Sequence, residues 1–593
     1  MWAPAAGRVE VRLLDGDRLE PLVAAERGYH VGVLDGVGPG SRYLLRLDGG
    51  PERPDPASRL QPEGVHGPSA VVAPPATPIA AGWEGHPLEE LVFYEIHVGT
   101  FSEAGTLDGA VPHLAALEEL GVTAVELMPI AQFPGERNWG YDGVQPYAVQ
   151  LSYGGPEALR RFAEAAHAAG LSVFLDVVYN HLGPEGNYLS EFGPYFDDGY
   201  RTPWGRALNF DGPESDEVRR YFAENALEWL TDYGLDGLRL DAIHGIIDTS
   251  ARPFLAELAE AVEARARQLG RPLHVVSESD LNASRVVRPR EQGGYGHAAQ
   301  WCDDFHHALH TMLTGERRGY YTDYGNLEQL ARALREGYVF QGERSDYRRR
   351  RHGDSTAGLP GSAFVVCAQN HDQIGNRMLG DRLAAALSPE QLRLAAATVL
   401  LSPFLPLLFM GEEYGETAPF PYFVSHQDPG LLEAVREGRR REFSGFDWQG
   451  QPPDPGAPAT FASARLRRGL AERSPHRELL AWHRELLRLR RQIPVLSRPD
   501  RRNLEVRALP AERAIALRRG AAPGEVLVLL GFGAAPCELE LEAAPGAWRR
   551  LLDSADPRWG GSGTITPDPL VSDGRLRLSL APLAVTVLER VPE

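Results

Sequence analysis

Two carboxylates and one guanidinium stand where neighbouring predicted strands end. Arg239 and Asp241 are two residues apart in LDGLRLD (235–241), so along a strand their side chains point to the same side. A guanidinium beside a carboxylate keeps that carboxylate ionised, which suits a nucleophile. Glu278 ends the next predicted strand, where the nearby charge of Asp241 would raise its pKa and keep it protonated. One ionised and one protonated carboxylate make the pair that glycoside cleavage requires, roughly 5–5.5 Å apart in enzymes that retain the anomeric configuration.

Polar residues follow two further predicted strands. Asp176 is followed by Asn180 and His181, and His371 is next to Asp372. Asp, Asn and Ser often cap the helix after a strand, so capping alone can explain any single one of these residues. Polar clusters at four strand ends are much harder to explain in that way, and barrel enzymes place catalytic residues at the carboxyl ends of their strands. The pattern therefore favours an active site.

The elements that must position these residues are visible from about residue 90 onward. Short apolar runs alternate there with amphipathic helical patterns such as PEALRRFAEAAHAAG. Strands that alternate with helices in this way predict an α/β fold, the (β/α)8 TIM barrel. The predicted strands are 91–98, 122–128, 171–178, 235–241, 273–279, 298–304, 362–368 and 405–411.

Both ends of the chain have the alternating pattern of short antiparallel strands. Val9, Val11 and Leu13 show it near the start, and it returns in EVLVLLGF after the helical pattern SPHRELLAWHRELLRLRRQI. The Pro- and Gly-rich stretch APPATPIAAGWEGHP (73–87) is typical of a linker. We therefore predict an N-terminal β-sandwich at 1–80, the barrel at 88–500 with a short insertion after its third strand, and a C-terminal β-sandwich at 503–593.

The composition argues against several other kinds of protein. A formal net charge of −20 repels polyphosphates, so no nucleic acid partner is expected. The chain contains no lysine, which excludes a lysine Schiff base and a P-loop lysine. Its three cysteines lie far apart, a sparse and odd count that suits a cytoplasmic location. No signal peptide and no apolar run of about 18 residues is evident, so no membrane span is expected.

Four ordered segments resemble the signature segments of the α-amylase family of glycoside hydrolases. They are DVVYNH (176–181), GLRLDAIH (237–244), SESD (277–280) and AQNHDQIGN (368–376), and FMGEEYGE (409–416) is similar to the family's eighth strand. By position, the resemblance implies Asp241 as nucleophile, Glu278 as general acid/base and Asp372 as a third carboxylate that stabilises the transition state. It also implies substrate contacts or support for the carboxylates at His181, Arg239, His244 and His371. The stretch that begins WAPAAGRVEV resembles the immunoglobulin-like, carbohydrate-module-like domain that precedes the barrel in branching and debranching members.

Four longer stretches resemble the trehalohydrolase subfamily that acts on maltooligosyl-trehalose. They are YEIHVGTFSEAGTLDGA, LMPIAQFPGERNWGYDGV, SESDLN and DDFHHALHTMLTGE. The resemblance implies cleavage of the α-1,4 bond next to a terminal trehalose unit, with maltooligosyl-trehalose and related α-glucans as substrates and a maltooligosyltrehalose synthase upstream. Two alternatives stay open, a 1,4-α-glucan branching enzyme or other α-1,4-glucan-acting enzyme of the family, and a non-catalytic carbohydrate-binding scaffold. The intact set of three carboxylates argues against the scaffold.

Two loops supply further candidate residues for substrate binding. WGYD (139–142) predicts Tyr141 and Asp142 near the barrel mouth, and the resemblance favours Tyr141 stacking on a sugar ring. The sixth predicted strand ends in Asp303 and Asp304, and His306 and His307 follow it. With His310, these histidines have a spacing that could also bind a metal, but we expect the segment to line the substrate cleft. Asn180 matches a calcium ligand of some relatives, yet no further oxygen ligands are evident, so neither calcium nor a cofactor is expected.

Overall fold

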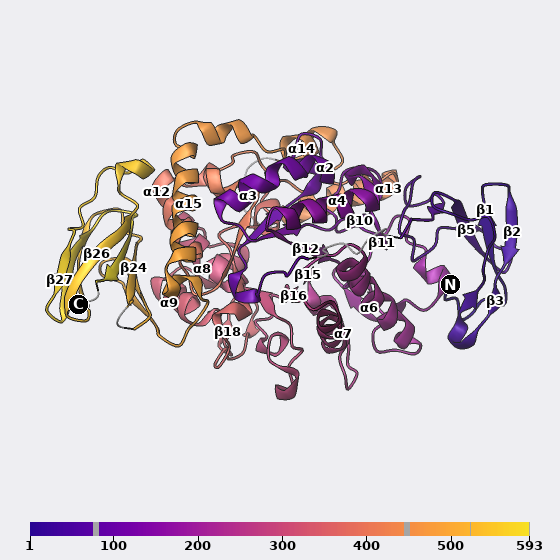
Figure 1. Ribbon diagram of the computed structural model, residues 1–593, viewed down its shortest axis with the longest axis horizontal. Coiled ribbons are helices and arrows are strands. Elements are labelled where there is room, and N and C mark those ends of the chain that lie inside the picture. Colours follow the sequence, from indigo (N-terminus) through magenta and orange to yellow (C-terminus); the bar gives the residue numbers. More distant parts are fainter. Residues whose placement is uncertain (75–81, 444–450, 522–523, 592–593) are drawn as a thin grey trace.

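Three regions follow one another along the chain and along the long axis of the molecule (Figure 1). The computed structural model describes residues 1–74, 82–443, 451–521 and 524–591. An N-terminal sheet lies at one end, a barrel in the middle and a C-terminal sheet at the other end (Figure 1). The part of the predicted linker at 75–81 lies outside the described residues.

The middle region is a closed barrel of parallel strands, which confirms the predicted (β/α)8 fold. Each strand falls within one of the predicted apolar runs. In sequence order they are β8 (Phe93–Ile96), β9 (Ala124–Leu127), β12 (Ser172–Val177), β15 (Gly237–Leu240), β16 (His274–Ser277), β17 (Ala299–Trp301), β20 (Phe364–Val366) and β21 (Leu405–Phe409). β21 pairs with β8 and closes the ring.

The barrel interior changes from apolar to ionisable along β8, β9 and β12. Near the amino ends, Phe93, Ala124 and Phe174 belong to one buried apolar cluster. Since side chains alternate between the two faces of a strand, the residues two positions later, Glu95, Glu126 and Asp176, belong to the same face; each is at most 2% exposed. Gly237 makes room for the Phe174 ring, because a Cβ there would lie 2.2 Å from the ring.

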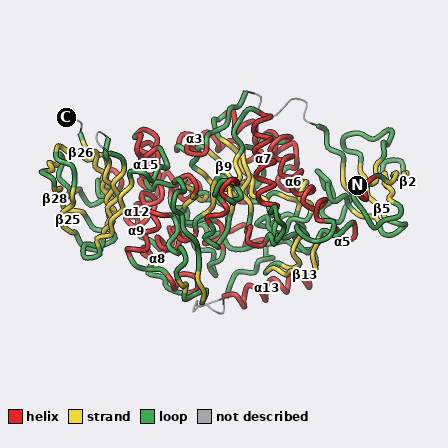
Figure 2. The backbone as a smooth tube through the Cα atoms, turned by 90° about the horizontal axis from the view of Figure 1, so that it is seen from below, coloured by secondary structure: helices red, strands yellow, loops and turns green. Residues whose placement is uncertain are grey.

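Helices surround the barrel strands, whereas the two flanking regions consist mainly of strands and loops (Figure 2). α4 (Gly155–Ala168) is an example of how the sequence forms this layer. Its apolar residues Leu159, Phe162 and Ala166 recur at helical spacing and are fully buried. The other long helices of this region are α6 (Ser215–Asp232), α7 (Phe254–Leu269), α8 (Asp303–Thr314), α9 (Leu327–Glu336), α12 (Pro389–Leu400), α13 (Pro429–Phe443) and α15 (His476–Gln492).

The flanking regions are antiparallel sheets. The N-terminal sheet has the order β2-β1-β5-β6, with β7 also paired to β5. These strands are β1 (Val9–Leu13), β2 (Arg18–Pro21), β5 (Arg42–Leu47), β6 (Glu52–Arg53) and β7 (Ser69–Ala70), beside a small hairpin of β3 (Val23–Ala24) and β4 (His30–Val31). The exact domain boundaries drawn from the sequence stay predictions.

The C-terminal region has a six-stranded sheet in the order β22-β23-β24-β29-β26-β27 and a separate pair, β25 with β28. Trp548, Leu576 and Leu578 belong to one buried apolar cluster that joins the two sheets. The strands are β22 (Leu504–Leu509), β23 (Ala514–Arg519), β24 (Val526–Gly531), β25 (Cys537–Glu542), β26 (Gly546–Asp553), β27 (Leu570–Ser572), β28 (Arg575–Leu580) and β29 (Val585–Arg590). Within the part of the chain that the structure describes, no helix is both long and apolar enough to cross a membrane.

Candidate active site

A cavity of about 530 Å³ opens where the barrel strands end. Its walls come from the residues that follow several different strands, as in other barrels whose sites lie at the carboxyl face. The sequence-predicted residues that line it are Tyr141, Asp142, His181, Asp241, His244, Glu278, Asp303, His307, His371 and Asp372. Arg239 lies beneath the cavity and is fully buried.

The Arg239 guanidinium joins three carboxylates. Its Nη1 lies 2.6 Å from Asp176 Oδ2 and 2.9 Å from Asp241 Oδ1. Its Nη2 lies 2.8 Å from Glu278 Oε2, an ion contact without hydrogen-bond geometry. The guanidinium carbon also lies 4.3 Å from the centre of the Trp301 ring, a cation–π contact. One cation therefore orients carboxylates from three adjacent strands.

Asp241 has an environment that favours its ionised form. Asn180 Nδ2 donates to Asp241 Oδ2 at 2.6 Å and to the Asp241 backbone oxygen at 2.7 Å. Burial acts to raise the pKa of Asp241, but the charges of Arg239 and His181 and the Asn180 hydrogen bond outweigh it and lower this pKa below its usual value. Asp241 is therefore a carboxylate near neutral pH, as a nucleophile must be.

The pKa of Glu278 is shifted in the opposite direction, upward. Burial raises the pKa of Glu278 well above its usual value, and the charges of Asp241 and Asp372 raise it further against the effect of Arg239. The backbone N–H of Ala242 donates to Glu278 Oε2 at 2.8 Å. Ala242 has a φ of 37°, a left-handed conformation that is strained for a residue with a Cβ. The two carboxyl groups thus differ in protonation, the division of roles that acid-assisted glycoside cleavage needs.

His371 is held within the barrel by contacts with Glu95 and Tyr141. Its Nδ1 contacts Glu95, and its Nε2 lies 2.7 Å from the hydroxyl of Tyr141, which donates to Asp176 at 2.6 Å. Burial lowers the pKa of His371, but Glu95 more than compensates and raises it to about 9. The ring of Tyr141 stacks on His371 at 5.2 Å between centres. Tyr141 thereby lines the cavity while its hydroxyl anchors the imidazole.

Asp372, the third predicted carboxylate, is more open to the cavity, with 40% of its side chain exposed. It lies in the first turn of α10 (His371–Gly375), which the side chain of Asn370 caps. Asn376 Nδ2 donates to Asp372 Oδ1 at 3.2 Å. A carboxylate held in this way can accept hydrogen bonds from sugar hydroxyls.

The structure does not bring Asp304 and His306 to this cavity. Asp304 accepts hydrogen bonds from the backbone N–H groups of Val339 and Phe340, at 2.6 Å and 2.9 Å, and so anchors the loop after α9. His306 and His310 line a separate cavity of about 340 Å³. Residues three or four apart share a helix face, so α8 turns Asp303 and His307 toward the active-site cavity and His306 and His310 away from it. Within the described ranges, no group of three or more His, Cys, Asp or Glu residues could hold a metal ion.

Several aromatic residues of the rim were missed by the sequence analysis. Trp204, in the hairpin of β13 (Phe196–Thr202) and β14 (Gly205–Leu208), stacks on His181 at 5.4 Å and is 43% exposed. Tyr320 and Tyr347 line the same cavity. Exposed aromatic rings are the usual surfaces for packing on sugar rings. The only sequence signal was the Trp within the short insertion after the third barrel strand.

Asn180 has both ends of its amide engaged by the protein. Its nitrogen donates to Asp241, and its oxygen contacts His181 Nδ1.

Three charged residues that the sequence did not predict also line the cavity, namely Asp280, Arg348 and Arg439. Arg348 pairs with Asp280 at 2.9 Å.

Comparisons with known proteins identify this architecture. Residues 92–202 match the family model of the alpha amylase catalytic domain. The chain is 46% identical over 497 residues to a malto-oligosyltrehalose trehalohydrolase of Saccharolobus solfataricus, covering 83% of this chain and 84% of that protein. It is 44% identical to a protein of the same name from Rhizobium sp., covering 99% of this chain and 97% of that protein.

A solved structure supports the same assignment. A crystal structure from Salmonella typhimurium, provisionally described as an alpha amylase, superposes with a TM-score of 0.88 at 40% identity. The match covers 100% of this chain and 97% of that chain. The chain therefore belongs to the α-amylase family of glycosidases.

Proposed function

We propose that the chain is a retaining hydrolase that cleaves the α-1,4-glucosidic bond next to the terminal trehalose of maltooligosyl-trehalose and releases trehalose. The observation that carries this proposal is the similarity to the trehalohydrolase of Rhizobium sp., which extends over nearly the whole of both chains. The aligned region therefore spans the loops of the substrate cleft as well as the barrel. The proposed preference for maltooligosyl-trehalose rests on that similarity alone.

The proposed reaction is a double displacement. Glu278 protonates the glycosidic oxygen while Asp241 attacks the anomeric carbon, which releases the trehalose unit and leaves a glycosyl group on Asp241. Glu278 then deprotonates a water, which attacks the same carbon and restores Asp241. The pairing of both carboxyl groups with one guanidinium supports a short spacing between them, as retaining enzymes need.

The third carboxylate, Asp372, is proposed to contact sugar hydroxyls and favour the distorted ring of the transition state. Its partial exposure beside the buried pair supports this role. We place the enzyme in the cytoplasm, downstream of a maltooligosyltrehalose synthase that supplies the substrate. Related α-glucans are expected to be poorer substrates.

Specificity requires polar groups that meet hydroxyls presented only by an α,α-1,1-linked leaving group. Asp303 and His307, which line the cavity from α8, are candidates together with Asp142. Asn138 Nδ2 donates to Asp142 at 2.7 Å and so fixes its orientation. A wrong sugar would leave such groups without partners, which penalises its binding.

The test compares kcat/KM for maltotriosyl-trehalose and maltopentaose, which have equal numbers of glucose units. We expect a clear preference for maltotriosyl-trehalose, with trehalose as a major product. Equal values would instead favour a general α-1,4-glucan hydrolase. New α-1,6 branch points formed from amylose would favour a branching enzyme.

A further inference from the structure

A second and larger cavity, of about 1120 Å³, lies at the opposite end of the barrel. Its lining includes Val92 and Thr123, which precede β8 and β9, and Ser362, which precedes β20. Much of the remaining wall comes from the end of α15 and the segment that leads into β22, and the segment before β8 contributes Glu89 and Glu90. This cavity is therefore at the amino ends of the strands, between the barrel and the C-terminal sheet, and apart from the catalytic residues.

The charge of this cavity differs from that of the whole chain, whose formal net charge is −20. Three acidic residues line it, Glu89, Glu90 and Asp500. Twice as many arginines do so, namely Arg335, Arg490, Arg491, Arg498, Arg501 and Arg502. A local excess of positive charge in a concave site concentrates anions against the overall field of the protein.

Two of these arginines are available to a ligand. Arg490 is committed to the backbone oxygens of Leu400 and Ser402, at 2.8 Å and 3.0 Å, and Arg502 is paired with Asp500. Over the described ranges, the side chains of Arg491 and Arg498 have no hydrogen-bond or ion-pair partner, and both are exposed. Guanidinium groups match phosphate oxygens in charge and in geometry.

Two buried arginines, Arg490 in the lining and Arg519 outside it, add to the attraction for an anion. Arg490 and Arg519 both donate to the backbone oxygen of Ser402, and no carboxylate pairs with either of them within the described chain. Burial lowers the pKa of Arg490 to about 10, and burial together with the charge of Arg490 lowers the pKa of Arg519 to about 9. An anion in the cavity would compensate these charges, because buried ions interact strongly.

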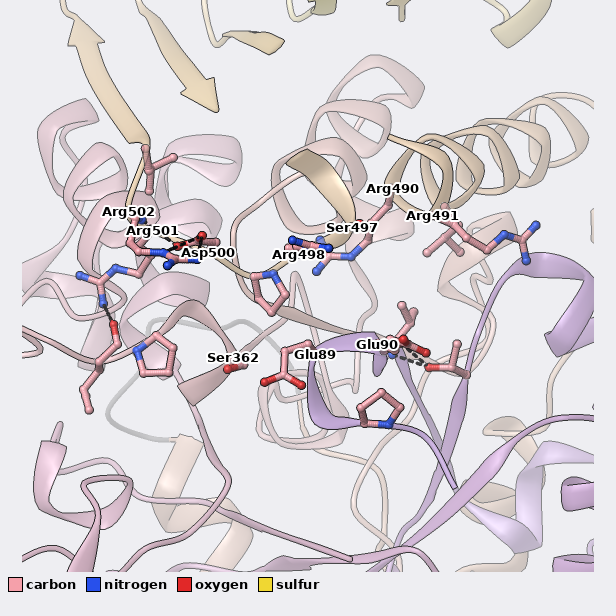
Figure 3. A pocket seen from close by; sticks show the side chains of 18 of the residues that line it. Glu89, Glu90, Ser362, Arg490, Arg491, Ser497, Arg498, Asp500, Arg501 and Arg502 are labelled. Carbon is pink, nitrogen blue, oxygen red and sulfur yellow. Dashed lines mark hydrogen bonds and ion pairs between the residues drawn. The ribbon is translucent and has the colours of Figure 1, made fainter. Parts of the chain in front are cut away.

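The facing wall has different chemistry. Figure 3 shows the labelled arginines along one side, with Glu89, Glu90 and Ser362 on the other. Among the described residues, no ion pair joins Glu89 or Glu90 to these arginines, and both carboxylates are exposed. Carboxylates and a hydroxyl accept hydrogen bonds from sugar hydroxyls. No aromatic side chain in the described part of the lining offers a stacking surface for a nucleobase.

We propose that this cavity binds a phosphorylated sugar, with the phosphate on the side lined by Arg491 and Arg498 and the sugar hydroxyls on the side lined by Glu89 and Glu90. Such a ligand offers an anion to the arginine side and hydroxyls to the facing side, whereas a free phosphate or a neutral sugar offers only one of the two. The site lies away from the catalytic carboxylates, so this binding does not depend on the specificity proposed above.

The test is isothermal titration calorimetry of the full chain with glucose 6-phosphate and with inorganic phosphate. We expect saturable binding of glucose 6-phosphate, weakened about tenfold or more in the double variant R491Q/R498Q, because charge-assisted hydrogen bonds are lost. The matched control is R484Q, which removes one exposed charge of α15 outside the cavity lining and should leave the affinity unchanged. Circular dichroism and Tm of each variant check that the fold is kept.

The second variant, E89A/E90A, isolates the sugar half of the proposal. This variant should bind glucose 6-phosphate several-fold more weakly, because it loses the carboxylates that accept hydrogen bonds from the sugar hydroxyls. Its affinity for inorganic phosphate should not fall, because the removed carboxylates repel phosphate. Absence of glucose 6-phosphate binding, or equal affinity in R491Q/R498Q and the wild type, would overturn the site. Equal affinity of wild-type protein for inorganic phosphate and glucose 6-phosphate would overturn its assignment to a sugar phosphate.

Discussion

The two ends of the barrel interior use the same strands for different purposes. Near the amino ends, Phe93 and Phe174 meet edge to face at 5.0 Å within an apolar cluster. Two residues further along the same strands, Glu95 and Asp176 are equally buried but ionisable. The difference shows that position along a strand, at constant burial, separates the part of the barrel that holds it together from the part that does chemistry.

Because they are buried, the carboxylates at the charged end need a cation as partner to stay ionised. Asp176 and Asp241 share Arg239, and Glu95 is matched by His371. Glu126 has no hydrogen-bond partner for either carboxyl oxygen among the described residues, and burial raises its pKa well above the usual value. A buried carboxyl group without a cation is therefore kept neutral, because desolvation penalises the charged form.

The largest expected effect is the loss of the proposed nucleophile, Asp241, at the charged end. Asp241→Ala should lower kcat/KM by roughly 10⁴-fold or more, because in the proposed double displacement Asp241 is the group that forms the glycosyl-enzyme. The variant should stay folded by circular dichroism. Near-normal turnover in a folded Asp241→Ala protein would refute the assignment.

Glu278→Gln should reduce turnover of natural substrates by roughly 10²–10⁴-fold, since it removes proton donation to the leaving group. Substrates with activated leaving groups need little protonation, so their first step should stay fast. Burst kinetics with an aryl glycoside measure that step. If activated substrates gain nothing over natural ones, Glu278 is not the acid.

A substitution at the apolar end should lower the stability of the fold and leave the catalytic rate almost unchanged. Phe174→Ala should lower the free energy of unfolding by about 3–5 kcal/mol, because it leaves a cavity in a fully buried cluster. Denaturant unfolding measures this change, and kcat/KM per folded molecule should stay within a few-fold of the wild type. A catalytic loss as large as that of Asp241→Ala would erase the contrast between the two ends.

Glu95→Gln tests the ion pair of the charged end through its pH dependence. The folded-state pKa of His371, about 9, lies above the usual value of about 6.5, so the pair stabilises fully below pH of about 6.5 and loses this contribution as the pH rises through about 9. The free energy of unfolding of Glu95→Gln should therefore fall furthest below that of the wild type near pH of about 6, by an amount on the order of 3 kcal/mol. A difference that does not shrink toward high pH would contradict the assigned charge of His371.

The smallest effect is expected outside the barrel interior. Arg484 pairs with Glu119 at 3.5 Å, and both side chains are well exposed. Arg484→Gln should change the free energy of unfolding by less than about 0.5 kcal/mol, because exposed ion pairs are screened by solvent. Thermal unfolding of this variant beside Glu95→Gln compares an exposed with a buried ion pair directly. If Arg484→Gln lost as much free energy of unfolding as Glu95→Gln, burial would not explain the difference between the two ion pairs.

The sequence alone determined what depends on local geometry. Each of the predicted strands lies where an apolar run of limited length is flanked by helical spacing, because those periods follow directly from backbone structure. The side-by-side placement of Arg239 and Asp241 was predictable for the same reason, since residues two apart on a strand share a face.

Only the tertiary structure decided which distant residues meet. The register of neighbouring strands brings Asp176 and Glu278 to one guanidinium, and the rotation of α8 selects Asp303 and His307 over Asp304 and His306. The rim position of Trp204 and the wall that faces Glu89 depend in the same way on segments far apart in the chain. Such contacts are set by how the barrel closes and how its layers pack, and no local period in the sequence encodes those distances.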